Sequence, residues 1–171
     1  MIVPKVSRRF THLHRPHLDY SESVRIDFEF IEPYLPEKVG SILDIGCGMA
    51  GIDVLLKKKF PEAKLSLLDG DGLSPQYSWS LEGRPYSNLK ATETLLKENG
   101  VKVDQWLKVG TKDLLQADLI ISLLSWGFHY PLSSYKVKGF CIADLRKDFE
   151  EKRGLVIMES NKLNRCAWYE G

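Results

Sequence analysis

The sequence predicts an α/β protein whose strands form one mostly parallel, doubly wound sheet. Three observations support this fold class. Short apolar runs alternate with amphipathic segments of helical spacing, a glycine-rich turn joins the first run to the next segment, and 171 residues suit one compact domain. Such alternation places parallel strands side by side, with helices packed on the faces of the sheet.

The first helices and strands are predicted from the spacing of apolar residues and from the prolines and glycines that end each segment. From Ser21, an N-cap residue, apolar positions recur at helical spacing until Pro33 and Pro36 end the helix. Residues 41–45 form a buried strand that glycines terminate, and residues 52–60 form the next helix. A second strand covers residues 64–69.

The second half of the chain continues the alternation. A helix covers residues 88–99, and a weak strand covers residues 103–109. Residues 117–124 form a strong strand and residues 155–159 another, and a helix over roughly residues 141–152 joins them.

The overall composition indicates how the chain is organised and which kinds of partner it does not bind. Residues 1–20 form a basic N-terminal arm, and residues 21–171 form a single domain. A formal net charge of +1 gives no field that attracts nucleic acid or a membrane surface. No segment reaches the length of a membrane span, and three cysteines without a CxxC pair fit a reducing compartment. We therefore expect a cytoplasmic protein with neither nucleic acid nor membrane as a partner.

A glycine turn follows the first strand, at Gly46, Gly48 and Gly51. Glycines let the chain turn sharply and let its backbone approach a ligand, and the following helix presents unpaired N–H groups there. Dinucleotide-binding proteins use these groups for a pyrophosphate, but Asp44, just before the turn, would repel phosphate. A carboxylate suits the ammonium group of S-adenosylmethionine, so we expect that cofactor.

The run Ile42-Leu43-Asp44-Ile45-Gly46-Cys47-Gly48 resembles motif I of class I S-adenosylmethionine-dependent methyltransferases, which have a Rossmann-like fold. In that family a second acid, at the end of the second strand, accepts hydrogen bonds from the ribose hydroxyls. Asp69 occupies this place, and Asp71 is the near alternative. The resemblance implies a cofactor-binding set of Asp44, Gly46, Cys47, Gly48, Gly51, Asp69, Gly70, Asp71 and Ser122.

Methylation of an alcohol requires removal of its proton, and His129 lies in the loop after the strong strand. We expect His129 to be the catalytic base, and Trp126, Phe128 and Tyr130 to bind the substrate. This loop resembles that of small-molecule O-methyltransferases. The alternative is that the aromatic side chains pack the domain and the histidine caps a turn.

The basic arm suggests a contact with the acceptor. Arg15 is placed there as a substrate-binding residue for a phosphate or carboxylate group. The arm histidines, His12, His14 and His17, are separated by Pro16 and lack a carboxylate or cysteine partner, so we expect no metal site.

The chain departs from this family at its C-terminal end. Class I methyltransferases usually finish with a helix and an antiparallel strand pair, whereas residues 160–171 leave room for one short strand. We therefore expect a sheet that is truncated at this end. Its exposed strand either pairs with a second copy, giving a homodimer, or stays as a protected edge.

The sequence thus predicts an enzyme that transfers a methyl group to a hydroxyl oxygen of a small, sugar-like acceptor. One alternative is a subunit of a larger assembly that binds S-adenosylmethionine or S-adenosylhomocysteine without turnover. Another, which rests on the glycine pattern alone, is an NAD-binding oxidoreductase.

Overall fold

The protein is described by a computed structural model that covers residues 20–70 and 89–171. Arg15, Asp71 and the histidines of the arm lie outside the described residues, and so does the expected arm itself up to residue 19.

Seven strands form one sheet in the order β3-β2-β1-β4-β5-β7-β6. Strands β1 to β5 are parallel to one another, and β7 runs antiparallel to both β5 and β6. The predicted α/β class and mostly parallel sheet are confirmed. The strands are β1 (Ser41–Ile45), β2 (Lys64–Leu68), β3 (Gln105–Leu107), β4 (Leu114–Ser122), β5 (Lys136–Arg146), β6 (Leu155–Glu159) and β7 (Leu163–Glu170).

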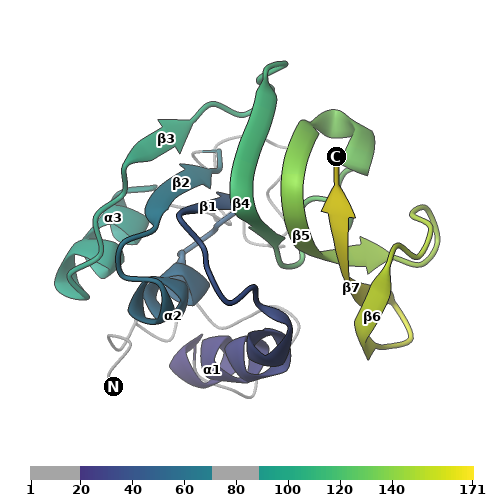
Figure 1. Cartoon of the computed structure of the whole chain (residues 1–171), viewed down its shortest axis with the longest axis horizontal. Coiled ribbons are helices and arrows are strands. Elements are labelled where there is room, and N and C mark those ends of the chain that lie inside the picture. Colours follow the sequence, from purple (N-terminus) through teal and green to yellow (C-terminus); the bar gives the residue numbers. More distant parts are fainter. Residues whose placement is uncertain (1–19, 71–88) are drawn as a thin grey trace, which may run out of the picture.

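Three α-helices accompany the sheet in the described residues: α1 (Tyr20–Ile31), α2 (Gly51–Lys59) and α3 (Leu89–Glu98). All three contribute to one buried cluster with side chains of β1, β2 and β4, so they cover the same face of the sheet. Figure 1 shows α1 and α2 beside each other on this face, and α3 packs against α2. A one-turn 3-10 helix, Glu32–Tyr34, ends α1 where Pro33 removes a backbone donor.

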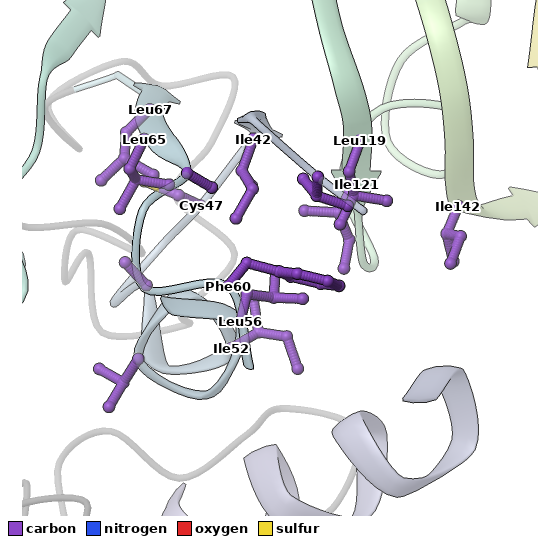
Figure 2. Close-up of a cluster of buried hydrophobic side chains, with 14 of the residues drawn as sticks. Ile42, Cys47, Ile52, Leu56, Phe60, Leu65, Leu67, Leu119, Ile121 and Ile142 are labelled. Atoms are coloured by element: carbon purple, nitrogen blue, oxygen red, sulfur yellow. The ribbon is translucent and has the colours of Figure 1, made fainter. Parts of the chain in front are cut away.

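Helix α2 is held against the middle of the sheet by apolar side chains. Leu56 and Phe60 lie opposite strand residues such as Ile42 and Ile121, as Figure 2 shows. These four side chains are buried, and the burial of each such side chain contributes about 1.5–3 kcal/mol to folding. This packing fixes the N-terminus of α2 relative to the end of β1.

The other face of the sheet is covered by the connection between β4 and β5, residues 123–135. Its buried side chains Trp126, Leu132 and Tyr135 pack on β4, β5 and β7. In the described part of the chain, this face carries a one-turn 3-10 helix, Leu132–Ser134, and no α-helix. The connection has 13 residues, about the length that a crossover between parallel strands needs.

The predicted helix over residues 141–152 is wrong. Residues up to Arg146 belong to β5, which pairs with β4 on one side and β7 on the other. The segment from Cys141 to Leu145 is buried throughout, as expected for a central strand covered on both faces. A continuous apolar run carries no period that separates a buried strand from a buried helix, and here the pairing with two neighbours decides.

The expected truncation of the sheet is also wrong. Because β5 replaces the predicted helix, residues 147–171 remain for further structure, and they form the antiparallel pair β6 and β7. This is the strand pair that the family resemblance implies after the fifth strand. Strand β6 forms one edge of the sheet, and its pairing with a second copy stays a prediction.

The strand order reverses between β1 and β4. From β1 the chain moves outward to β2 and β3, and from β4 it moves outward in the opposite direction. In open α/β sheets a crevice forms at such a reversal, beyond the carboxyl ends of the strands, and ligands bind there. Among the described residues, no helix has the length and apolar character needed to span a bilayer.

Candidate functional site

The glycine turn leaves β1 at the point where the strand order reverses. Gly46 and Gly48 adopt positive φ angles of 79° and 53°, and Ala50 adopts 55°. Glycine enters this left-handed region without penalty, whereas alanine pays about 1–2 kcal/mol. Strain of this kind persists where the surrounding structure enforces it, and such positions concentrate at functional sites.

Asp69 ties the glycine turn to the end of β2. Its carboxylate accepts hydrogen bonds from the backbone N–H of Gly48 and of Gly70, each at 2.6 Å. On the other side of the turn, the hydroxyl of Thr92 in α3 donates to the Gly48 carbonyl at 2.7 Å. The central glycine is therefore held through both its donor and its acceptor.

Gly51, the third glycine of the pattern, contacts α1. Its backbone N–H donates to the Tyr20 hydroxyl at 2.9 Å, and a Cβ at Gly51 would lie 2.6 Å from that oxygen. The absence of a side chain therefore lets α1 approach the first turn of α2. At Gly48, in contrast, a Cβ would meet no atom of residues 20–70 or 89–171 within 4 Å, so this part of the structure leaves space next to Gly48.

Two buried acids face each other behind the turn. Asp44 of β1 is 3% exposed, and Asp53, in the first turn of α2, is fully buried. Burial, followed by repulsion from Asp53 and Asp69, raises the pKa of Asp44 well above its usual range. Burial also raises the pKa of Asp53, to about 7.

Among the described residues, no donor reaches either carboxyl oxygen of Asp53 with hydrogen-bond geometry. The carboxyl of Asp44 nevertheless lies within hydrogen-bonding distance of Asp53. The two observations agree once one carboxyl carries a proton, because two ionised carboxylates have no donor to share.

Two further members of the predicted cofactor set are engaged within the protein. The buried Ser122 hydroxyl donates to the Ile45 carbonyl at 2.6 Å and accepts the Trp126 N–H at 2.8 Å. It thus joins the ends of β4 and β1. Cys47 is buried, and burial together with the neighbouring acids, Asp44 first, raises the pKa of its thiol well above the ordinary value.

The aromatic side chains of the loop after β4 lie in two different surroundings. Trp126 is 2% exposed and packs near Trp168, with ring centroids 6.2 Å apart, and its indole N–H donates to the Leu132 carbonyl. Phe128 is buried in a small cluster with Leu124. These two side chains form part of the core, as the packing alternative expects, and their contact with a substrate stays a prediction.

Tyr130 lies at the glycine turn instead. Its hydroxyl is 3.1 Å from the Ser125 hydroxyl, and a Cβ at Gly46 would overlap Ser125 and lie 3.5 Å from the Tyr130 hydroxyl. Two hydroxyl groups of the loop after β4 therefore cover the first glycine of the turn. They lie beside the reversal of the strand order, where ligands bind in open α/β sheets.

His129 is half-buried, and it directly precedes Tyr130 in the sequence. Its backbone N–H donates to the Ser125 carbonyl at 2.8 Å, and its ring lies edge-on to Phe128 with centroids 4.9 Å apart. The hydrogen bond completes a tight turn from Ser125 to His129. The position of His129 is thus fixed relative to the residue that covers Gly46.

A buried ionic network braces the start of this loop. The Arg165 guanidinium of β7 donates two hydrogen bonds to Asp144 of β5, at 2.7 and 3.0 Å, and one to Asp27 of α1, at 2.9 Å. Asp144 also accepts the backbone N–H of Leu124, which has a positive φ of 57°. Although burial alone would lower it, Asp144 and then Asp27 hold the pKa of Arg165 above its ordinary value.

Several residues of this site were not predicted: Tyr20, Asp53, Thr92 and Ser125. The sequence did contain a signal for Asp53. It precedes Leu56 by three residues and Phe60 by seven, so helical spacing places it on the same apolar face as these two residues. Tyr20 and Thr92 approach the turn from other helices, so their roles depend on tertiary packing. Ser125 stood in the predicted loop, but no pattern in the sequence distinguished it from its neighbours.

Comparison with known proteins establishes the fold. No protein-family model matches the sequence, and no curated protein matches it either. Among solved structures, coclaurine N-methyltransferase bound to N-methylheliamine and SAH superimposes with a TM-score of 0.50 at 13% identity, covering 75% of this chain and 37% of that chain. The fold is that of class I methyltransferases.

A protein from Pyrococcus horikoshii OT3 also has a TM-score of 0.50, at 18% identity, covering 82% of this chain and 64% of that chain. This chain thus spans between about a third and two-thirds of the length of the two solved proteins. The antiparallel β7 between β5 and β6 agrees with this fold.

Proposed function

We propose that this protein transfers the methyl group of S-adenosylmethionine to a hydroxyl oxygen of a small, sugar-like acceptor. The observation that carries the proposal is the set of acids, Asp44, Asp53 and Asp69, around an open glycine turn. They stand where the strand order reverses and where the fold places its ligand.

The residues present fit an ammonium-bearing nucleoside better than a dinucleotide. Two buried carboxyl groups behind the turn favour a cation and disfavour a pyrophosphate. The Gly51 N–H, which could otherwise face a phosphate at the helix N-terminus, donates to the Tyr20 hydroxyl. Open space at Gly48 lets a ligand approach the backbone there.

S-adenosylmethionine supplies an electrophilic methyl group on a sulfonium centre. In our proposal Asp44 attracts the ammonium group, and Asp69 accepts hydrogen bonds from the ribose hydroxyls. Ser125 and Tyr130 hold the acceptor at the crevice, and His129 takes the proton from its hydroxyl as the new oxygen–carbon bond forms.

The acceptor is proposed to be a small molecule, because the net charge of +1 provides no field for a polyanion. The three cysteines are free thiols, which supports the proposed location in the reducing cytoplasm.

The direct test is incubation with labelled S-adenosylmethionine and a panel of sugars and small alcohols. We expect transfer to at least one of them, and His129→Ala should lower kcat by about 10²–10⁴-fold. Tyr130→Phe keeps the ring and should act mainly on KM. Full activity of His129→Ala on every acceptor found would remove the histidine from the mechanism.

A second candidate is a subunit that binds the cofactor without turnover. The observation in its favour is that, in the described residues, loop segments cover the face of the sheet opposite α1, α2 and α3. Binding of S-adenosylhomocysteine by calorimetry, with methyl transfer that starts only when a partner protein is added, would favour this candidate over the first.

A further inference from the structure

Asp53 has no role in the function proposed above beyond its negative charge, yet its surroundings are unusual. The side chain is fully buried between α2 and β1, and neither oxygen receives a donor from the described residues. Among the side chains of the described residues, the carboxyl of Asp44 is its close polar neighbour. A buried carboxylate without a donor is costly, so an ionised Asp53 next to an ionised Asp44 is disfavoured.

The groups around the pair do not relieve this cost. Tyr20 approaches from α1, Cys47 from the glycine turn and Asp69 from the end of β2. Tyrosine, cysteine and aspartate side chains are neutral when protonated and negative when deprotonated. None of the three therefore supplies a positive charge. The strongest influences on the pair, in the described part of the chain, are burial and other acids.

The helix N-terminus does not replace a cation either. Asp53 is the third residue of α2, where the helix dipole favours a negative charge. That effect is weaker than the repulsion between two buried carboxylates in contact. The Gly51 amide of the first turn is directed to the Tyr20 hydroxyl, and the backbone N–H of Asp53 itself lowers the pKa of Asp53 by less than burial raises it.

We propose that Asp44 and Asp53 act as one buried acid, which holds a proton in the ligand-free protein and releases it when a ligand ammonium group reaches Asp44. Asp53 is then a positioning residue: the ligand meets Asp44, which keeps a small exposed fraction, and Asp53 sets its charge. This inference rests on the proposed function, because it takes the ammonium from the amino-acid part of the cofactor.

The charge balance favours this exchange. With one proton, the pair carries a single negative charge. On binding, the proton leaves to solvent and one ligand ammonium arrives, so the pair with its ligand again carries a single negative charge. The affinity for such a ligand therefore rises with pH, by about tenfold per pH unit where one full proton is released.

The first test needs no ligand. Aspartate carboxyl carbons of the whole protein are titrated by nuclear magnetic resonance, with Asp53→Asn and Asp44→Asn to assign them. We expect one carboxyl of the wild type to titrate near or above about pH 7, and Asp44 to titrate at least about one pH unit lower in Asp53→Asn. Wild-type carboxyls that all titrate below about pH 5 would overturn the proposal, even if a variant fails to fold.

The second test measures proton release on binding. S-adenosylhomocysteine is titrated calorimetrically at about pH 6 and 7.5, in buffers of different ionisation enthalpy. We expect the wild type to release up to about one proton and Asp53→Asn to release less than half as much. Glu93→Gln, which removes an exposed helical charge from α3, is the matched control and should behave as wild type. Methylthioadenosine, which lacks the ammonium group, should release no proton.

The outcomes separate the two proposals. Binding of S-adenosylhomocysteine with no proton release and a pH-independent Kd overturns the shared-proton inference and leaves the proposed function standing. A carboxyl that titrates near or above pH 7, together with no binding at either pH, supports the shared proton but overturns the proposed function.

Discussion

The Asp69 carboxylate accepts the backbone N–H of Gly48 at 2.6 Å, although 21 residues separate the two in sequence. This contact joins the end of β2 to the centre of the glycine turn. Thr92 holds the carbonyl of the same glycine, so the turn is anchored by two other elements before any ligand binds. A preorganised turn reduces the ordering cost of binding.

Substitution of Asp69 removes this anchor. Asp69→Asn keeps one acceptor oxygen but puts an NH2 group where the other oxygen accepts an N–H. We expect a loss of about 1–3 kcal/mol of stability by chemical denaturation, and at least about a tenfold loss of affinity for S-adenosylhomocysteine.

Asp118→Asn is the matched control, because Asp118 accepts the Gly40 N–H at the other end of β1. This variant should lose stability and keep its affinity. Equal losses of affinity in both variants would mean that Asp69 acts on the fold alone.

The second and third glycines of the pattern, Gly48 and Gly51, should respond differently to alanine. In Gly48→Ala the Cβ has space, so the stability cost is the backbone strain of about 1–2 kcal/mol, but the methyl group projects into the proposed ligand site. In Gly51→Ala the Cβ would lie 2.6 Å from the Tyr20 hydroxyl and 2.8 Å from Val24, which displaces α1.

We therefore expect Gly48→Ala to lose ligand binding with a modest change in melting temperature. Gly51→Ala should lose about 1–3 kcal/mol of stability from overpacking. Thermal denaturation with and without S-adenosylhomocysteine measures both effects, and full ligand stabilisation of Gly48→Ala would contradict the placement of the ligand.

The buried acids make the ligand-free protein pH-sensitive. The folded pKa of Asp53 is raised to about 7, above the unfolded value of about 4, so between these pH values the folded state binds more protons. Stability is then fully present below about pH 4 and falls as the pH rises through about 7.

Asp53→Asn should flatten this part of the stability profile and raise the free energy of unfolding at pH 8 by about 1–3 kcal/mol. Urea denaturation between about pH 5 and pH 8 tests this, with Glu93→Gln as control. A variant that is less stable than the wild type across this whole range would show that Asp53 is satisfied in the fold.

Arg165→Met tests the buried ionic network at the start of the loop after β4. The substitution leaves Asp144 and Asp27 buried without a cation, so we expect a loss of about 3–5 kcal/mol. Arg153→Met removes the exposed pair with Glu170 and should cost at most about 1 kcal/mol. If Arg165→Met costs as little as Arg153→Met, the buried network does not stabilise the fold.

Most of the fold was predictable, because strands β1, β2 and β4 are short apolar runs that end at turn-forming residues. Residues 41–45 form a strand as predicted, and Gly51–Lys59 agrees closely with the predicted helix. The segment at β5 failed because Ile142, Ala143 and Leu145 are apolar without a period, and their pairing with strands far away in sequence determines their structure.

The site was predictable where a single element carries the information. Asp44, Gly46 and Gly48 lie together because β1 and its turn place them, whatever the rest of the chain does. The aromatic loop could not be divided in advance, since the burial of Trp126 and the placement of Tyr130 at Gly46 depend on how residues 123–135 cross the sheet.

The measurement that tests the central claim most directly is calorimetric binding of S-adenosylhomocysteine and of NAD to the wild-type protein under the same conditions. The acids around the glycine turn predict a micromolar or tighter Kd for S-adenosylhomocysteine, on the order of 8 kcal/mol of binding free energy, and binding of NAD at least about a hundredfold weaker. Tighter binding of NAD than of S-adenosylhomocysteine would contradict the account.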